Sequence, residues 1–323
     1  MKTTRVSPGS IPPAFASSVP EDDVVIPAEA SAEEAERMRA KAAKRRRRHE
    51  FPPAPEPLPV PVPDNHTHLD FRSGRQTVAL DDALATANAV GVSSVIQVGC
   101  DVASSRAAVE LAAADRRVLA AVAIHPNDAA VLAERGELDA ALEDIRSLAG
   151  HERVRAIGET GLDYYRTGVE GHPAQRASFE AHLALAVEHG KALQIHDRDA
   201  HEDVVDVLLS AERLPESVVF HCFSGDADLA RICNEHGWYL SFSGTVTFKN
   251  SVDLHAALDI ADPEHVLVET DAPFLTPHPF RGQPNSSYMI PYTVRFMAER
   301  SGEDLGDLCA RLAANTERVY GTF

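Results

Sequence analysis

The chain has 323 residues, with 44% hydrophobic and 25% charged side chains and a formal net charge of −18 at pH 7. This length and composition suffice for a sizeable buried core in one large domain or two ordinary ones. The negative charge repels a phosphate backbone at long range, which argues against tight binding of duplex DNA. It does not exclude a metal-dependent enzyme, because bound cations recruit phosphate locally.

Export and membrane insertion both lack support in the sequence. No run of about eighteen apolar residues is present, and the N-terminus lacks the apolar stretch of a secretory signal. The four cysteines are scattered without the short spacing of a zinc knuckle or a redox pair, which fits thiols in a reducing compartment. We therefore expect a cytoplasmic protein with no membrane partner.

Residues 1–60 are predicted to form a disordered, proline-rich tail or linker. They hold 10 Lys/Arg and 9 Asp/Glu, so nearly all of the negative charge belongs to residues 61–323. A short exposed helix is expected between about residues 31 and 49. It ends in the basic run Lys44–Arg48, which either contacts nucleic acid or an anionic membrane or is simply solvated, and we favour the solvated tail. The proline-rich stretch 51–57 predicts a semi-rigid spacer.

From residue 61 onward, short apolar runs alternate with segments of helical period. Runs this rich in Val, Ile, Leu and Ala are typical of strands buried on both faces, as in a parallel sheet. The eight expected strands are 62–69, 94–99, 118–124, 154–158, 192–196, 218–221, 239–243 and 266–270. The expected helices are 77–90, 104–115, 128–149, 173–189, 199–212, 226–236, 248–260, 287–300 and 303–320.

Eight strand-then-helix units in about 260 residues match the usual size of a (β/α)8 barrel. The sequence therefore predicts an α/β fold, with a TIM barrel over residues 61–323. A doubly wound open sheet is the alternative. It lacks support because no GxGxxG or GxxxxGK[ST] motif is present.

His66 and His68 are separated by one residue, Thr67, at the end of the first expected strand. On a strand both imidazoles project from the same face, so the pair indicates half of a metal site. A solvated pair of histidines at a turn is the alternative, because so short a motif often arises by chance.

Ionisable residues also end several of the other expected strands. Barrel active sites are built at this end of the strands, where side chains from different strands converge. Four imidazoles and two carboxylates there form a mixed nitrogen and oxygen set that suits Zn, Mn, Fe or Ni, with Mg also possible. The six residues are His66, His68, Glu159, His196, His221 and Asp271.

Five motifs in the same order together resemble the TatD family of metal-dependent, deoxyribonuclease-like hydrolases in the amidohydrolase superfamily. The resemblance covers about residues 61–320 and implies a TIM barrel with a two-metal centre. The motifs are Asp64–Asp70, Gly158–Tyr164, Ile195–Ala200, His221–Gly225 and Glu269–Leu275. A departure follows the last motif, where Asn285 is kept but the family's following Glu-Pro is lost, which bears on the loop and on substrate preference.

The resemblance also implies a role for each strand-end residue. One cation is held by His66, His68 and Asp271, the second by His196 and His221, and both are bridged by Glu159. The cations are expected to be Mg, Mn or Zn. Asp271 suits a second role as acceptor of the proton of the attacking water, which makes Asp271 and Glu159 the expected catalytic residues.

Three further residues near the strand ends are predicted to bind substrate. Arg198 is a candidate phosphate contact, with a salt bridge to a neighbouring Asp as the alternative. His125 either touches substrate or supports the rim, and Asp163 either touches substrate or orients a metal ligand. Three aromatic residues could stack on a base but are expected to pack instead: Tyr164, Tyr165 and Phe274.

Together these features predict a deoxyribonuclease that cleaves phosphodiester bonds with a water activated by two metal ions. The substrate is expected to be single-stranded DNA or DNA ends. The first alternative is the same centre acting on an ester or amide, as an aminoacyl-tRNA deacylase or a small-molecule amidohydrolase. The second is a non-enzymatic protein recruited through the basic tail, against which the intact ligand set argues.

Overall fold

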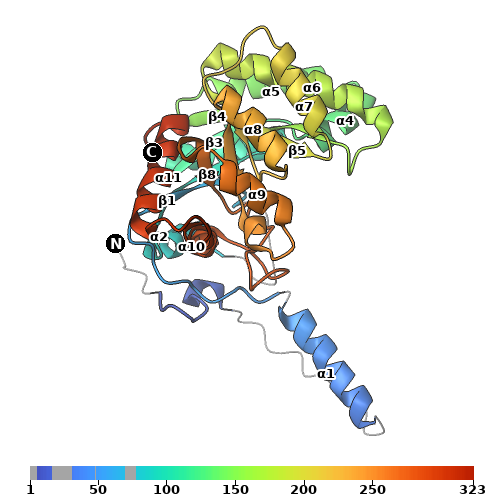
Figure 1. Cartoon of the computed structure of the whole chain (residues 1–323). Coiled ribbons are helices and arrows are strands. Elements are labelled where there is room, and N and C mark those ends of the chain that lie inside the picture. Colours follow the sequence, from blue (N-terminus) through green and yellow to red (C-terminus); the bar gives the residue numbers. More distant parts are fainter. Residues whose placement is uncertain (1–5, 17–30, 48, 70–77) are drawn as a thin grey trace.

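Eight parallel strands follow one another around a barrel in their sequence order (Figure 1). The computed structural model describes residues 6–16, 31–47, 49–69 and 78–323. The strands are β1 (Val62–Thr67), β2 (Val92–Val98), β3 (Val118–Val122), β4 (Val154–Asp163), β5 (Ala192–Arg198), β6 (Val218–Phe220), β7 (Tyr239–Phe242) and β8 (Val266–Val268). Together with the helices between them, they confirm the predicted (β/α)8 barrel.

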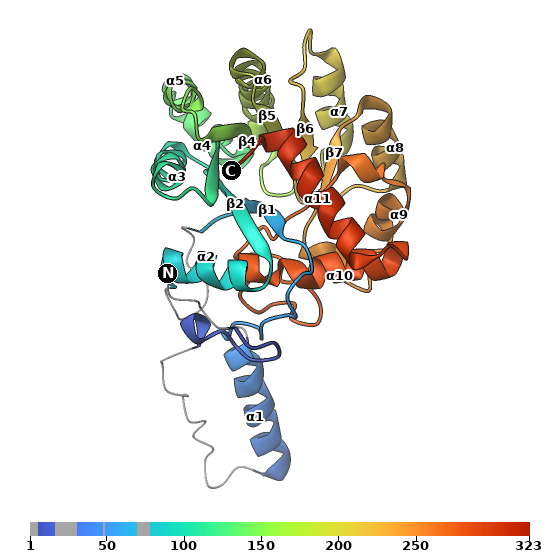
Figure 2. The ribbon, with the colours of Figure 1, turned by 90° about the vertical axis from the view of Figure 1, so that its left-hand side faces the viewer.

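Helices surround the sheet on its outer face (Figure 2). They are α2 (Leu80–Ala89), α3 (Val102–Ala114), α4 (Pro126–Glu134), α5 (Leu138–Ala149), α6 (His172–His189), α7 (His201–Ser210), α8 (Ala227–His236), α9 (Val252–Ile260), α10 (Ile290–Ser301) and α11 (Leu305–Tyr320). The single helix expected over residues 128–149 is in fact two, α4 and α5. The chain turns between them at Gly136, whose φ of 69° favours glycine.

The strands form because their residues are apolar on both faces. All five residues of β3 are buried, as expected for a strand with helices outside it and side chains of the barrel interior inside it. One strand is longer than predicted, since β4 continues past Gly158 to Asp163. A Cβ atom at Gly161 would lie 2.0 Å from the carbonyl oxygen of His196, so glycine is needed where β4 runs this close to β5.

The ring closes where β1 meets β8, a contact called here the seam. Among the described residues, backbone pairing of the β type across the seam consists of one bridge, between Thr67 and Ala272. Side-chain hydrogen bonds strengthen this contact. The Asn65 amide donates to the Val268 carbonyl (2.7 Å). The buried carboxylate of Asp64 accepts from the Thr270 backbone N–H (2.9 Å) and hydroxyl (2.7 Å). Polar side chains therefore complete the closure that the three-residue β8 cannot provide alone.

The proline-rich stretch, predicted to be a spacer, packs against the barrel. Residues 49–60, called here the docked segment, bury Phe51, Ala54 and Leu58. The Leu58 N–H donates to the Val90 carbonyl after α2 (3.0 Å). Tyr288, which lies just before α10, donates its hydroxyl to the Pro52 carbonyl (2.7 Å). Prolines lack an N–H but keep their carbonyls as acceptors, so the barrel supplies the donors.

The helix expected before the docked segment is α1 (Ala32–Arg47), which projects away from the barrel (Figure 1). Two residues of the sequence motifs lie outside the described residues: Arg48 of the basic run and Asp70 of the first strand-end motif. Within the described part of the chain, no helix is long and apolar enough to cross a membrane.

Candidate metal centre

The six strand-end residues predicted as metal ligands lie together at the carboxyl ends of the strands, called here the mouth. They come from β1 and the residue after it, from β4 and β5, and from the turns after β6 and β8. β4, β5 and β6 are neighbours in the sheet, and closure of the barrel brings β1 and β8 opposite them. Glu159 lies at the centre, buried and in contact with imidazoles from several strands.

One oxygen of Glu159 faces His66 of β1 and His68, which follows the end of β1. Its Oε2 lies 3.5 Å from Nε2 of His66 and 3.8 Å from Nε2 of His68. The Oδ1 atom of Asp271 is at similar distances, 3.8 Å and 3.6 Å, from the same two nitrogens. Two nitrogens and two oxygens thus converge on one point.

The other oxygen of Glu159 faces a second set of imidazoles. Its Oε1 lies 2.6 Å from Nδ1 of His196, 2.9 Å from Nε2 of His221 and 3.5 Å from Nε2 of His125. His125 was predicted to contact substrate, and it lies beside this second set. Its Nδ1 accepts from the Asn127 N–H (3.1 Å) at the start of α4, which leaves Nε2 to face the mouth.

This donor arrangement fits divalent cations. The Nε2 atoms of His66 and His68 are 3.2 Å apart, close to the separation of two ligands that share one ion. Neutral imidazole and carboxylate are ligand types that Zn, Mn and related ions accept. Three groups of donor atoms close enough to hold an ion occur among the described residues: His66, His221 and Glu269; His66, His68 and Glu159; and His125, Glu159 and His196.

The electrostatics of the mouth are dominated by mutual pairing. Burial acts to raise the pKa of Glu159, but the neighbouring His221 and His125 hold it well below its ordinary value. Burial acts to lower the pKa of His221, yet Glu159 and Glu269 raise it well above the ordinary range. In the same way the hydrogen bonds to Asp163 and Glu159 outweigh burial and raise the pKa of His196 to about 8. Acid and base therefore stabilise one another's charged forms.

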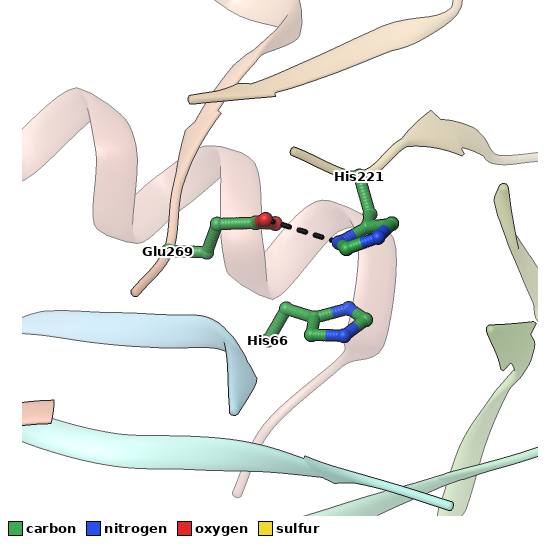
Figure 3. A group of neighbouring side chains, drawn as sticks. All are labelled: His66, His221 and Glu269. Carbon is green, nitrogen blue, oxygen red and sulfur yellow. Dashed lines mark hydrogen bonds and ion pairs between the residues drawn. The ribbon is translucent and has the colours of Figure 1, made fainter. Parts of the chain in front are cut away.

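Glu269 belongs to the last sequence motif but was given no role of its own. Its Oε1 lies 3.1 Å from Nδ1 of His221 and also accepts from the Cys222 N–H (2.8 Å). Oε2 accepts from the Ser241 hydroxyl (2.6 Å). Figure 3 shows Glu269 pointing at His221, whose ring stacks on His66 with centroids 3.8 Å apart. A carboxylate bonded to one ring nitrogen fixes the orientation of the other, here Nε2 toward Glu159. The sequence did contain a signal for this role: Glu269 lies two residues before Asp271, a spacing that puts both side chains on the same face of an extended chain.

Cys100 is a second residue near the metal centre that the sequence analysis did not select. Its Sγ lies 3.8 Å from Nδ1 of His68 and 3.9 Å from Oε2 of Glu159. It follows the end of β2, so the strand-end rule that selected the histidines applied to this residue too.

Asp163 is buried and holds His196 in place. Its Oδ2 lies 3.2 Å from Nε2 of His196 and accepts from the Asn127 amide (3.1 Å). Burial acts to raise the pKa of Asp163, but the hydrogen bonds from His196, the Arg166 N–H and Asn127 lower it. This geometry matches the orienting role, one of the two that the sequence left open for Asp163.

Arg198 lies at the rim, with its guanidinium carbon 3.9 Å from the centroid of the Tyr165 ring. Within residues 6–16, 31–47, 49–69 and 78–323, the structure gives it no carboxylate partner, so the expected salt-bridge alternative is not found there. The guanidinium is therefore available to an anion at the rim.

A (β/α)8 barrel that gathers imidazoles and carboxylates at the carboxyl ends of its strands has the architecture of a metal-dependent hydrolase. Comparison with known proteins agrees. The family model described as TatD related DNase matches residues 63–321. The chain belongs to the TatD family and is a hydrolytic enzyme.

Curated relatives cover nearly the whole barrel. An uncharacterized metal-dependent hydrolase TatD from Mycobacterium tuberculosis is 44% identical over 263 residues, which are 80% of this chain and 97% of the relative. A protein named 3'-5' ssDNA/RNA exonuclease TatD from Enterobacter lignolyticus is 34% identical over 247 residues, covering 75% and 92%. The crystal structure of the TatD homologue YJJV from Escherichia coli superposes with a TM-score of 0.73 at 24% identity, covering 80% and 97%, and shares the fold.

Proposed function

We propose that this enzyme hydrolyses phosphodiester bonds in DNA and uses two divalent cations to do so. The observation that carries the proposal is the orientation of Glu159, whose two oxygens face two separate sets of imidazoles. A carboxylate in that position can bridge two ions, and paired ions are typical of enzymes that cleave phosphate esters. The description of the family as DNases and the exonuclease named among the relatives support the choice of substrate.

We assign the ligand sets from the family resemblance, and the distances of Glu159 and Asp271 to the imidazoles support them. The first ion is assigned to His66, His68 and Asp271, and the second to His196 and His221, with His125 beside the second set; Glu159 is the bridge. When bound, the cations supply a Lewis acid for the phosphoryl oxygen and lower the pKa of water, with Mg, Mn and Zn as the candidates.

Asp271 is assigned as the general base. Its backbone N–H donates to the His66 carbonyl (2.9 Å), and its φ of 53° is a conformation rarely adopted by residues other than glycine. The turn holds the carboxylate beside His66 and His68 while its side chain remains 13% exposed to the mouth. It can accept a proton from a water that approaches a phosphate there.

The charge of the protein favours single strands and ends over duplex. With a net charge of −18, the enzyme repels a long polyanion and has to bind its substrate through local contacts at the mouth. Arg198 is assigned one such contact, because its guanidinium lies at the rim and suits a phosphate.

The test is a substrate screen with metal analysis. The purified protein is incubated with Mg, Mn or Zn and with single-stranded DNA, duplex DNA, RNA, carboxylic esters and amides. We expect two equivalents of metal and cleavage of single-stranded DNA. Hydrolysis of esters or amides without cleavage of any nucleic acid would overturn the assignment in favour of the amidohydrolase alternative.

The variant Asp271→Asn tests the general base. We expect kcat to fall by about two to four orders of magnitude, the range attributed to general acid–base catalysis, with an unchanged circular dichroism spectrum. Activity close to that of the parent protein at full metal loading would contradict the role of Asp271 as base.

A further inference from the structure

Two exposed aromatic residues, Tyr165 and Phe274, follow strands that are opposite each other in the barrel. We propose that Tyr165 and Phe274 form a pair of base-stacking residues that selects single-stranded nucleic acid and sets its path across the site. This inference rests on the proposed function, because it names how the same site recognises its substrate.

Exposure distinguishes these two rings from the other aromatic residues. Among the residues that the structure describes, the largely exposed Phe, Tyr and Trp side chains are Tyr165, at 65%, and Phe274, at 50%. The other exposed large apolar side chains are aliphatic: Val131, Val169, Leu209, Val252 and Ile260. Leaving an aromatic ring in water forgoes about 25 cal/mol for each Å² that could be buried, so a ligand that covers the rings is favoured.

Tyr165 is held at the rim by its backbone. Its N–H donates to Oδ1 of Asp163 (3.1 Å), whose other oxygen contacts His196. The guanidinium of Arg198 lies against the Tyr165 ring at 3.9 Å. A cation on an aromatic face leaves the ring able to stack and places positive charge where a phosphate next to a stacked base would lie.

The adjacent Tyr164 provides a contrast within the same turn. Its hydroxyl donates to Asp203 (2.6 Å), and its ring stacks on His172 with centroids 3.7 Å apart. Tyr164 therefore packs, as the sequence predicted for all three aromatic residues. Tyr165 is largely exposed, with Arg198 against its ring.

Phe274 is fixed in a similar way on the far side. Its N–H donates to the Asp271 carbonyl (2.8 Å), and its carbonyl accepts from the Asn285 amide (2.6 Å). The ring centroid is 6.3 Å from that of His68. The backbone is thus held by hydrogen bonds while half of the residue remains exposed beside the metal centre.

The topology places the two rings across the mouth from each other. Tyr165 follows β4 and Phe274 follows β8, and these two strands are opposite in a ring of eight strands in sequence order. Glu159 belongs to β4 and Asp271 to the turn after β8 that also carries Phe274. A single strand that crosses the mouth can stack one base on each ring with a phosphate at the centre. In a duplex the bases are already stacked on one another, so the rings discriminate against it.

The test compares two oligonucleotides with the same phosphates, one of ordinary bases and one of abasic residues. For the ordinary strand we expect Tyr165→Ala and Phe274→Ala each to lower kcat/KM by about tenfold, within the range for loss of one base–aromatic stack. For the abasic strand the same variants should differ from the parent protein by less than about twofold, because no base is present to stack.

Three matched variants complete the design. Tyr165→Phe and Phe274→Tyr keep the rings and should keep the preference for the ordinary strand. Leu209→Ala removes an exposed aliphatic side chain of α7 and should leave both substrates unaffected. Equal losses on both strands would show a structural role, and no loss on either would show that the rings do not touch bases. Either result overturns the proposal.

A binding assay that does not depend on cleavage tests this inference separately from the proposed function. An oligonucleotide that contains 2-aminopurine loses fluorescence when the base stacks on a ring, whether or not it is cleaved. We expect quenching with Asp271→Asn and a loss of quenching when Tyr165→Ala or Phe274→Ala is added. If the parent protein cleaves no nucleic acid, the proposed function fails, and absence of quenching with ring-intact protein overturns the stacking pair separately.

Discussion

At the mouth, the pKa values of Glu159 and His221 are shifted in the opposite directions from those of a buried acid at the seam and a buried histidine in α6. At the mouth, Glu159 has a lowered pKa and His221 a raised one, so both are shifted toward their charged forms. At the seam, burial raises the pKa of Asp64 to about 7 despite its hydrogen bonds to Thr270. In α6, burial lowers the pKa of His182 to about 4. These last two are shifted toward their neutral forms.

The difference lies in the neighbours, because all four groups are buried. Asp64 is surrounded by hydroxyls and backbone, and Nε2 of His182 accepts from the Ile124 N–H (3.0 Å), which requires that nitrogen to be unprotonated. At the mouth Glu159 and His221 face each other, and this pairing offsets the cost of burial for both, whereas burial still lowers the pKa of His66 beside them. Paired charges in a buried cluster distinguish a functional centre from polar residues that only support the fold.

Glu159→Gln should have the largest effect. The amide keeps the size of the side chain but removes the charge and one of the two acceptor oxygens, so we expect loss of bound metal and a fall in activity of about three orders of magnitude or more. Metal content by mass spectrometry and kcat/KM on an oligonucleotide measure this. The control is Asp64→Asn, which removes a carboxylate that is also buried but lies at the seam. This variant should retain its metal. If both variants lose metal alike, the contrast between mouth and seam is wrong.

Asp64→Asn should alter the pH dependence of stability. Because the folded state raises the pKa of Asp64, it binds this proton more tightly than the unfolded chain does between pH 3.8 and about 7. The contribution of Asp64 to the free energy of unfolding therefore decreases by about 4 kcal/mol as the pH rises through that window. Urea unfolding from pH 4 to 7.5 should show that the variant lacks this decrease. An unchanged pH profile would contradict the burial of an easily protonated Asp64.

His182→Gln should remove a pH dependence of stability whose sign is opposite to that of Asp64. The folded state binds the His182 proton less tightly than the unfolded chain does between pH 6.5 and about 4. Its contribution to stability, about 3 kcal/mol, is therefore lost as the pH falls through that window. The glutamine carbonyl can still accept from Ile124, so the variant should unfold less readily in acid relative to its own stability at pH 7. Parallel pH profiles for parent and variant would show that His182 does not titrate on unfolding.

Much of the fold and the site could be predicted because both follow from local pattern. Continuous Val and Ala runs such as β3 indicate parallel strands, and a polar residue at the end of each run marks the mouth. The length of β4 could not be predicted, because Gly158 and Gly161 suggest the end of a strand. Their actual role is to let β4 approach β5, as the position of His196 shows.

The positions of the remaining residues depend on contacts between distant parts of the chain. Glu269 orients His221 across 48 residues of sequence, which no periodicity encodes. Exposure separated Tyr165 from Tyr164, although the two are neighbours of identical type. The docked segment was not foreseen, because proline content excludes helix and sheet but says nothing of carbonyls that accept from distant donors such as Tyr288.

The docked segment has a consequence for any shortened form of the protein. It contacts the end of α2 through Val90 and the start of α10 through Tyr288, and these helices follow the two strands of the seam. Phe15 and Phe51 complete an aromatic cluster with Tyr288, with ring centroids 4.8 Å apart in both Phe15 contacts. A fragment cut at the family boundary near residue 63 exposes this apolar surface and so favours self-association. We therefore expect the folding unit to begin upstream of residue 63, where the family match starts.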